Sequence, residues 1–157
     1  MMRAKQRLIR LAGLIVVVLA IGGCAATVPL MPQTLDEEAK RFAPSPEKTN
    51  IYLTRRSSLG MAVLFQVHLD GKLAGSIAPE TYLLFEVEPG KHQIAVITQE
   101  SQDAMTISAG RGENYFVDVV PKFGWRHARA ALEELSQEEG RKAVQNAKRA
   151  EPLSVRP

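Results

Sequence analysis

The feature that most constrains this chain is a two-residue alternation of apolar and polar side chains between residues 49 and 120. In residues 63–69 (VLFQVHL), every second residue from Val63 is large and apolar. Because successive side chains of a β-strand point to opposite faces, this pattern predicts a strand with one buried face. The alternation recurs at Leu83, Phe85 and Val87, at His92, Ile94 and Val96, at Met105 and Ile107, and at Tyr115, Val117 and Val119.

Turn residues separate these predicted strands. Asp70-Gly71 favours a type I′ hairpin turn, because both residues adopt positive φ at little cost, so residues 72–77 are expected to form the returning strand. Pro89-Gly90 and residues 109–112 mark later turns. Strands at roughly ten-residue intervals predict a mainly β fold, a β-sandwich of about seven or eight mostly antiparallel strands. Residues 125–132 are a candidate for the last strand, although their alanines disfavour it.

A short N-terminal helix and a C-terminal helix are expected to flank the sandwich. TLDE at 34–37 has the form of a capping box and predicts a helix over about 35–42 that docks Leu35 and Phe42. SQEE at 136–139 is a second capping box. The helix that follows it has a narrow apolar stripe of Ala143, Val144 and Ala147, and Gly140 within it costs about 1 kcal/mol relative to alanine.

The first 24 residues predict where the protein goes. Residues 1–10 carry four basic and no acidic side chains, and residues 11–21 are almost wholly apolar. The apolar stretch is too short for the roughly 20 residues of a membrane-spanning helix, and it fits a signal peptide. Ile21, Gly22 and Gly23 lead directly into Cys24, the only cysteine of the chain. This ending resembles the bacterial lipobox, in which the cysteine thiol receives a diacylglyceryl group.

The lipobox resemblance implies removal of residues 1–23 and acylation of Cys24 with chains such as palmitate. The membrane then becomes a partner through these N-terminal acyl chains. Residue 25 is Ala, not the Asp that retains many such lipoproteins on the inner membrane, so the resemblance implies an outer-membrane location facing the periplasm of a bacterial envelope. The alternative is a plain signal peptide or an uncleaved anchor, in which Cys24 is incidental.

The domain boundaries follow from composition. Residues 24–33 contain two prolines and no periodicity, which predicts a lipidated tether. Residues 34–150 hold the sandwich with its flanking helices, and residues 151–157 are expected to form a flexible tail. The whole chain has 20 Lys and Arg against 17 Asp and Glu, but removal of residues 1–23 leaves 16 against 17. This near-neutral balance argues against a nucleic-acid partner.

Several stretches together resemble one family. They are IYLTR at 51–55, HLDGKLAGSI at 68–77, VEPGKHQIAV at 87–96, AGRGENYFVDV at 109–119 and EEGRKAV at 138–144, after a helix that ends in Phe-Ala-Pro. Over residues 34–150 the chain resembles small bacterial lipoproteins of the DUF2846 family, a domain of unknown function. The DGK and PG segments are also similar to PEGA-type surface modules. Those modules are β-sandwiches without catalytic residues. No function is settled for the DUF2846 family, so the resemblance implies a fold and no activity.

The reactive side chains predict neither an enzyme nor a metal or cofactor site. His68, His92 and His127 do not have the spacing of zinc ligands, and no nucleophile-elbow pattern selects a serine. His92 is expected to be a hydrogen-bonded, partly buried imidazole. Asp118 lies opposite the apolar face of its strand and is expected to be exposed, and Arg55-Arg56 is expected to face water.

One cluster has the composition of an interaction surface. Residues 121–129 (PKFGWRHAR) combine aromatic and basic side chains, which interface centres favour. The candidate surface residues are Phe123, Trp125, Arg126, His127 and Arg129. In the favoured interpretation the two aromatic residues close one end of the sandwich and the basic residues are only solvated. The alternative is a contact surface for an envelope protein or a glycan.

These observations predict a lipid-anchored, non-enzymatic envelope protein that presents a β-sandwich surface to an envelope protein or to peptidoglycan. One alternative is a component of an assembly machine, similar in size and fold to the small β-sandwich lipoproteins of type VI secretion systems. The other alternative is a hydrolase acting on the cell wall, which would need a polar cleft with convergent ionisable residues.

Overall fold

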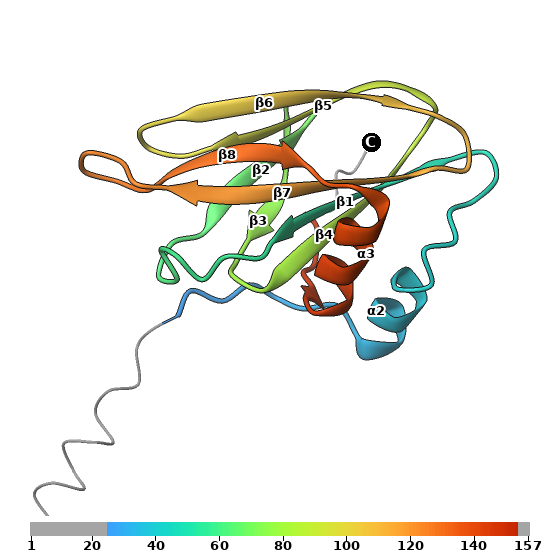
Figure 1. Ribbon diagram of the computed structural model, residues 1–157, viewed down its shortest axis with the longest axis horizontal. Coiled ribbons are helices and arrows are strands. Elements are labelled where there is room, and N and C mark those ends of the chain that lie inside the picture. Colours follow the sequence, from blue (N-terminus) through green and yellow to red (C-terminus); the bar gives the residue numbers. More distant parts are fainter. Residues whose placement is uncertain (1–24, 154–157) are drawn as a thin grey trace, which may run out of the picture.

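The structure, a computed structural model, describes residues 25–153 (Figure 1). These residues form nine strands in two sheets and two helices, so the predicted mainly β sandwich with flanking helices is confirmed. The signal peptide, the lipobox residues Ile21, Gly22 and Gly23, and Cys24 lie outside the described residues. The elements are α2 (Gln33–Ala39), β1 (Thr49–Arg55), β2 (Phe65–Leu69), β3 (Lys72–Ile77), β4 (Thr81–Val87), β5 (Gly90–Ile97), β6 (Gln102–Ala109), β7 (Asn114–Lys122), β8 (Arg129–Glu134), α3 (Gln137–Gln145) and β9 (Lys148–Arg149).

The two sheets face each other across the main core. One has the strand order β8-β7-β1-β4-β9 and the other β3-β2-β5-β6. The β1–β7 and β4–β9 pairs are parallel, and the other pairs are antiparallel. Ile51 and Leu53 of one sheet and Phe65, Val67 and Val96 of the other are fully buried. The two-residue alternation therefore marks the inner face of each sheet.

Both helices cover the outer face of the five-stranded sheet (Figure 1). Between the helices and the sheet lies a second cluster, in which the rings of Tyr52 and Phe116 stack with centroids 5.1 Å apart. Phe42 and Val144 pack against this cluster, and the Tyr52 hydroxyl donates a hydrogen bond to the carbonyl of Ala39 at 2.7 Å. Because layers lie on both of its faces, all seven residues of β1 are buried.

The β2–β3 hairpin confirms the turn expected at Asp70-Gly71. These residues have φ values of 50° and 79°, and the returning strand spans the predicted residues. The strand predicted from Val63, however, begins at Phe65, and Val63 lies in the preceding loop with its side chain exposed. β8, the strand predicted over residues 125–132, begins at Arg129, four residues after the predicted start.

The N-terminal helix differs from its prediction at both ends. It begins at Gln33 after Pro32, whose carbonyl accepts the amides of Leu35 and Asp36, so the predicted capping box at Thr34 is wrong. It ends at Ala39, and Phe42 lies beyond it with a φ of 56°. This left-handed residue turns the chain so that the Phe42 ring is buried, whereas Leu35 is exposed. The second capping box is confirmed, because Ser136 and Glu139 exchange both hydrogen bonds.

The described parts of the predicted tether and tail lie against the domain. The Ala26 amide donates to the carbonyl of Met61 at 2.8 Å, and Leu30 forms a β-bridge with Ala150. The amide of Leu153 donates to the carbonyl of Ala74 at 2.9 Å. These backbone hydrogen bonds fix the chain where composition alone suggests freedom. No helix within residues 25–153 is both long enough and apolar enough to cross a membrane.

Candidate interaction surface

Three connecting segments meet at one end of the sandwich and form what we name the loop surface. They are residues 56–64 between β1 and β2, residues 98–101 between β5 and β6, and residues 122–129 at the β7–β8 turn. Residues of the first and third segments, Leu59 and Phe123 among them, line one hollow of about 190 Å³. A larger groove of about 490 Å³ is lined by residues of all three segments. The three segments therefore form one continuous surface.

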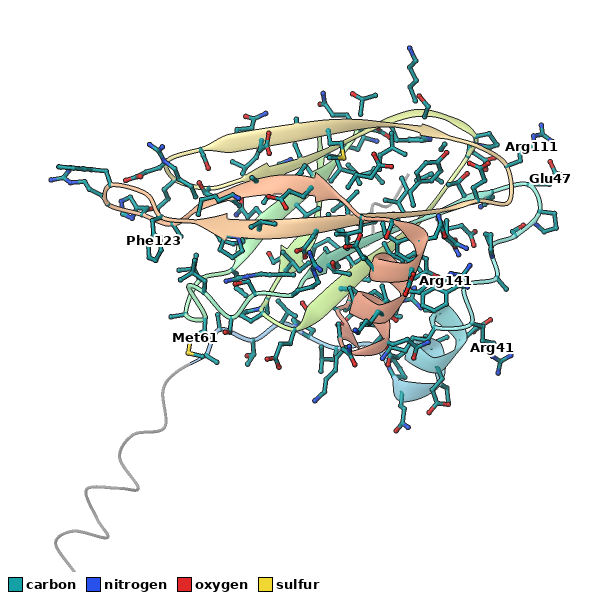
Figure 2. All side chains as sticks on the ribbon, viewed as in Figure 1. Arg41, Glu47, Met61, Arg111, Phe123 and Arg141 are labelled. Atoms are coloured by element: carbon teal, nitrogen blue, oxygen red, sulfur yellow. The ribbon has the colours of Figure 1, made fainter. Side chains whose placement is uncertain are left out.

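The two aromatic residues of the loop surface point into solvent. Phe123 is 86% exposed and Trp125 is 92% exposed. The expectation that they close the end of the sandwich is therefore wrong. The reason is geometric: the β7–β8 pairing ends at Lys122 and Arg129, and the residues between them extend past the core (Figure 2). Arg126, His127 and Arg129 are exposed in the same segment, so all five predicted surface residues lie together.

A neighbouring loop holds this aromatic turn in place. The carboxylate of Glu100 accepts hydrogen bonds from the backbone amides of Trp125, Arg126 and His127 at 2.9, 2.7 and 2.9 Å. Burial acts to raise the pKa of Glu100, but these three amides and the nearby Arg129 guanidinium outweigh it and hold that pKa below its usual value. Three consecutive amides around one anion form a rigid nest.

Gly124 is required for this arrangement. A Cβ at position 124 would overlap the carbonyl oxygen of His127 and the carboxylate of Glu100. The turn therefore tolerates no side chain at the residue between the two aromatics. Sequence reasoning missed Glu100 because it lies 25 residues before Trp125, and no local pattern links the two.

The β1–β2 segment adds further apolar side chains to the loop surface. Leu59, Met61, Val63 and Leu64 are each between 38% and 48% exposed. Among these four residues, the two-residue alternation predicts a buried strand position for Val63 alone. The signal that was available is the run of four apolar residues in MAVL, which does not alternate and follows Gly60.

Arg55 organises this segment from inside the protein. Its Nη1 donates to the carbonyl of Val63 at 2.5 Å, and its Nη2 donates to those of Leu59 and Gly60, both at 2.9 Å. The guanidinium lies 4.4 Å from the ring centroid of Phe65, and the residue is fully buried. Burial lowers the pKa of Arg55 to about 10. The expectation that Arg55 faces water is wrong, because the loop folds back over its side chain.

Asp118 is also buried, which overturns its predicted exposure. Its carboxylate accepts a hydrogen bond from the Thr54 hydroxyl at 3.0 Å and pairs with the Arg56 guanidinium at 2.9 Å. Thr54 and Asp118 are register partners in the parallel β1–β7 pair. They lie on the outer face of the sheet, and this face is covered because α3 packs on it.

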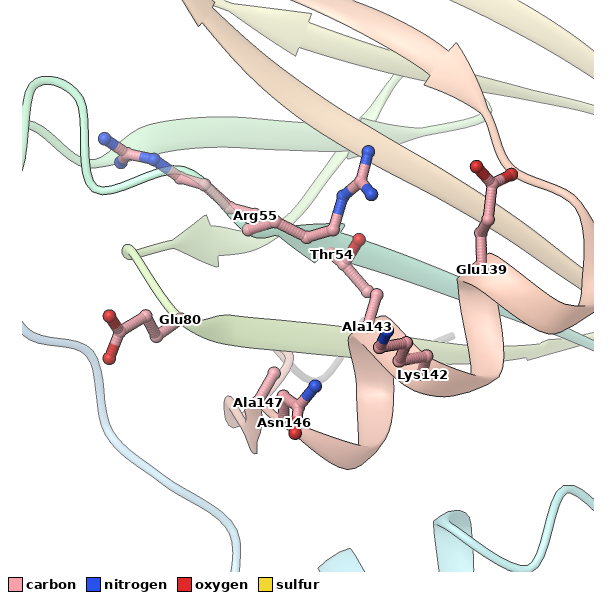
Figure 3. A pocket seen from close by; sticks show the side chains of 9 residues that line it. Thr54, Arg55, Glu80, Glu139, Lys142, Ala143, Asn146 and Ala147 are labelled. Atoms are coloured by element: carbon pink, nitrogen blue, oxygen red, sulfur yellow. The ribbon is translucent and has the colours of Figure 1, made fainter.

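A hollow of about 520 Å³ lies between the end of β1 and α3 (Figure 3). Its charged lining is mixed, with Arg55, Arg56 and Lys142 on the basic side and Glu80 and Glu139 on the acidic side. Three of these groups have structural partners, since Arg55 binds loop carbonyls, Arg56 binds Asp118 and Glu139 caps α3. In the part of the chain that the structure describes, no group of three or more His, Cys, Asp or Glu side chains is placed to hold a metal ion.

The predicted environment of His92 is confirmed. Its Nδ1 lies 2.8 Å from the Asp70 carboxylate and its Nε2 lies 2.8 Å from the Glu88 carbonyl oxygen. Burial acts to lower the pKa of His92, but the Asp70 and Glu88 oxygens raise it above its usual value. Because Asp70 is the first residue of the hairpin turn, this pair ties β5 to the β2–β3 turn.

The fold and the loop surface together define a small two-sheet domain with helices on one outer face and an aromatic, basic end. Residues 45–131 match the family described as "Protein of unknown function (DUF2846)". The chain is 35% identical over 141 residues to an uncharacterized protein of Haemophilus influenzae. The aligned region covers 88% of this chain and 83% of that protein. The chain belongs to the DUF2846 family, as its sequence motifs predict. No solved structure matches the chain.

Proposed function

We propose that this protein is a lipid-anchored, non-enzymatic protein of the bacterial envelope that binds through its loop surface. The observation that carries the proposal is the outward position of Phe123 and Trp125 in a turn that Glu100 holds rigid. Large aromatic side chains are normally buried, and an exposed pair beside basic residues is typical of a binding site. The sequence predicts an envelope protein or peptidoglycan as the partner.

A binding role is favoured over catalysis because the carboxylates that are buried or held at the loop surface, and Arg56 and Glu139 in the hollow beside α3, have structural partners. Glu100 binds backbone amides of the aromatic turn, and Asp118 binds Thr54 and Arg56. Glu139 caps a helix. General acid–base chemistry needs a group that faces a substrate within hydrogen-bonding distance, and these carboxylates already face protein donors.

The anchor follows from the lipobox at Ile21 to Cys24. Each buried methylene of an acyl chain contributes about 0.8 kcal/mol, so two or three chains hold a protein on a membrane essentially permanently. We place the protein on the outer membrane, facing the periplasm, because Ala and not Asp follows Cys24. Anchoring raises the effective concentration of any partner on the same surface, so individual contacts of low affinity are sufficient.

The anchor is tested by growing cells that express the full chain with an alkyne analogue of palmitate. We expect the wild type and the matched control Ala25→Ser to incorporate the label and Cys24→Ser to lose it. Label that persists in Cys24→Ser, or a wild type without label, would contradict the proposed anchor.

The binding surface is tested by placing a photo-crosslinking amino acid at position 125 in the full chain in cells. The control carries the same amino acid at position 111, because Arg111 is exposed at the opposite end of the domain (Figure 2). We expect an adduct from position 125 in clear excess over position 111. Equal yields at the two positions would show that the loop surface is not the binding surface.

A further inference from the structure

We infer that the partner of the loop surface is the lipid bilayer that holds the acyl anchor, so that this end of the sandwich rests on the membrane. The inference rests on the proposed function, because it requires acylation at Cys24. It goes further in that it names the lipid bilayer as the partner of the loop surface, in place of the envelope protein or peptidoglycan that the sequence predicts, and orients the domain. Three observations on the described residues carry it, and they concern the path of the chain, the apolar side chains and the charges.

The chain enters the domain at the loop surface. The amide of Ala26 donates to the carbonyl of Met61 at 2.8 Å, and Met61 belongs to the β1–β2 segment. Cys24 precedes Ala26 by two residues, and consecutive Cα atoms are about 3.8 Å apart, so the two Cα atoms lie within about 8 Å. Figure 2 shows Met61 and Phe123 at one end of the molecule and Arg41 and Arg111 at the other. An anchor at Cys24 therefore brings the loop surface to the membrane.

The exposed apolar side chains are concentrated at this same end. Ten large apolar residues are exposed within residues 25–153, and six of them belong to the loop surface. These six are Leu59, Met61, Val63, Leu64, Phe123 and Trp125. Aromatic residues, tryptophan in particular, are enriched where membrane lipid meets water, because their rings have an apolar body and a polar atom. A patch of this composition beside an acyl anchor fits the interfacial zone of a bilayer.

The charges of the loop surface have the sign that anionic lipids attract. Lys122, Arg126 and Arg129 are exposed around the aromatic turn. Lys122 pairs with Glu133 of β8 at 3.1 Å and Arg129 with Glu100 at 3.5 Å, so Arg126 is the one of the three with no carboxylate partner among the described residues. Glu100 is the only acidic residue in the three segments, and its carboxylate points inward to the turn amides. Basic residues near an anionic membrane surface are attracted within a Debye length of about 8 Å at physiological salt.

The loop surface is also pre-organised for this contact. Glu100 fixes the aromatic turn, and Arg55 fixes the β1–β2 segment through three carbonyl groups. Little conformational freedom is therefore lost when the side chains enter the bilayer interface. A protein or glycan partner would have to enter the narrow space between this surface and the membrane at the same point.

The test uses the acylated full-length product, purified in detergent and reconstituted into vesicles of phosphatidylethanolamine and phosphatidylglycerol. Trp125 is the only tryptophan of the chain, so the fluorescence of the natural protein reports on this one residue. We expect its emission to shift to the blue in vesicles and to be quenched when the lipids carry brominated acyl chains. The matched control combines Trp125→Phe with Arg111→Trp, which moves the reporter to the opposite end, and there we expect no shift and no quenching.

The outcomes separate the inference from the proposed function. An acylated protein that floats with the vesicles while Trp125 emits as in water would overturn the inference and leave the anchor intact. Absence of acyl mass on Cys24 would overturn the proposed function and the inference with it. In cells, a photo-adduct from position 125 with the mass of a phospholipid supports bilayer contact, and an adduct with a protein or with peptidoglycan in its place refutes it.

Discussion

Gly140 lies in the middle of α3, where helix propensity favours alanine by about 1 kcal/mol. The structure predicts the opposite result for Gly140→Ala. A Cβ at this position would overlap Cβ and Cγ of Phe116 on β7 and would lie 2.7 Å from its Cδ1. The absent side chain is what allows α3 to approach the sheet so closely.

The size of the effect depends on whether Phe116 can move. Its ring is almost fully buried, stacks on Tyr52 at 5.1 Å and meets Phe42 edge-on at 5.8 Å. Overpacking costs about 1–3 kcal/mol, and neighbours that fix the ring place this site in the upper half of that range. After the gain in helix propensity, we expect a net loss of about 1–2 kcal/mol in the free energy of unfolding.

The assay is urea denaturation of the purified protein, followed by circular dichroism. Lys142→Ala is the matched control, because Lys142 is exposed on the same helix and its side chain has no hydrogen-bond partner among the described residues, so its effect should be small. In a Phe116→Ala background the overlapping Cγ and Cδ1 are absent, and the space left by the ring lets the remaining Cβ contact relax. We therefore expect Gly140→Ala to cost less there than in the wild type, which appears as a coupling energy of at least about 1 kcal/mol in the double-mutant cycle. Stabilisation of the wild-type protein by Gly140→Ala would refute the close packing of α3.

Three further predictions concern charged residues. Arg55→Met removes the donor to three loop carbonyls. We expect the free energy of unfolding in urea to fall by about 2–3 kcal/mol and proteolysis to become faster within residues 56–64. Cleavage that increases equally along the whole chain would contradict a local role of Arg55. Asp118→Asn leaves Arg56 without its anion. We expect thermal unfolding to show a loss of about 1–3 kcal/mol in the free energy of unfolding, and an unchanged unfolding midpoint would contradict this. The pKa of His92 is raised in the folded protein, so its protonated form is stabilised by Asp70. The pair therefore contributes fully to stability below the ordinary histidine pKa of 6.5, and this stabilisation is lost as the pH rises through the pKa of His92 in the folded protein. Urea titrations from pH 5 to 8 should therefore show a decline that His92→Gln reduces by up to about 1 kcal/mol, and an identical decline in both proteins would refute it.

The sheet could be predicted where neighbouring residues decide the structure. Asp70-Gly71 specifies its hairpin because positive φ at two consecutive residues is a local property, and the structure shows both values. The alternation around Phe85 and Val117 likewise records the inner face of each sheet directly in the sequence. The second helix was predictable for the same reason, since its cap joins Ser136 and Glu139, which are only three residues apart.

The burial of charge could not be predicted, because it depends on segments far apart in the sequence. Asp118 alternates out of the main core and so has the pattern of a solvated residue. It is buried only because β1 and β7 pair in parallel and α3 then covers their outer face. Arg55 is hidden in the same way by a loop that folds back over it. Neither arrangement leaves a periodic signal.

The wrong predictions for Arg55 and for the aromatic residues Phe123 and Trp125 have one physical cause. The charged groups of Arg55 and Glu100 each hold a loop in place through hydrogen bonds to its backbone. The loop held by Arg55 exposes Leu59 and Met61, and the turn held by Glu100 exposes Phe123 and Trp125. A loop that only connected two strands would have no need of a buried arginine or of a carboxylate bound to three amides. Fixed loops with exposed apolar tips are expected where a surface must be ready to bind before its partner arrives, since ordering then adds no cost to binding.

The orientation that we infer also determines which surface remains free. β7 has nine residues and spans about 30 Å at roughly 3.3 Å per residue, from Lys122 at the loop surface to Asn114 at the opposite end. With the loop surface on the bilayer, the end that carries Arg111 and Arg41 (Figure 2) is the end farther from the lipid, and the length of β7 sets the separation of the two ends. A soluble periplasmic partner would therefore meet this far end first. A bilayer-bound loop surface and a partner at the far end are compatible, whereas a protein bound at Trp125 would exclude the lipid contact.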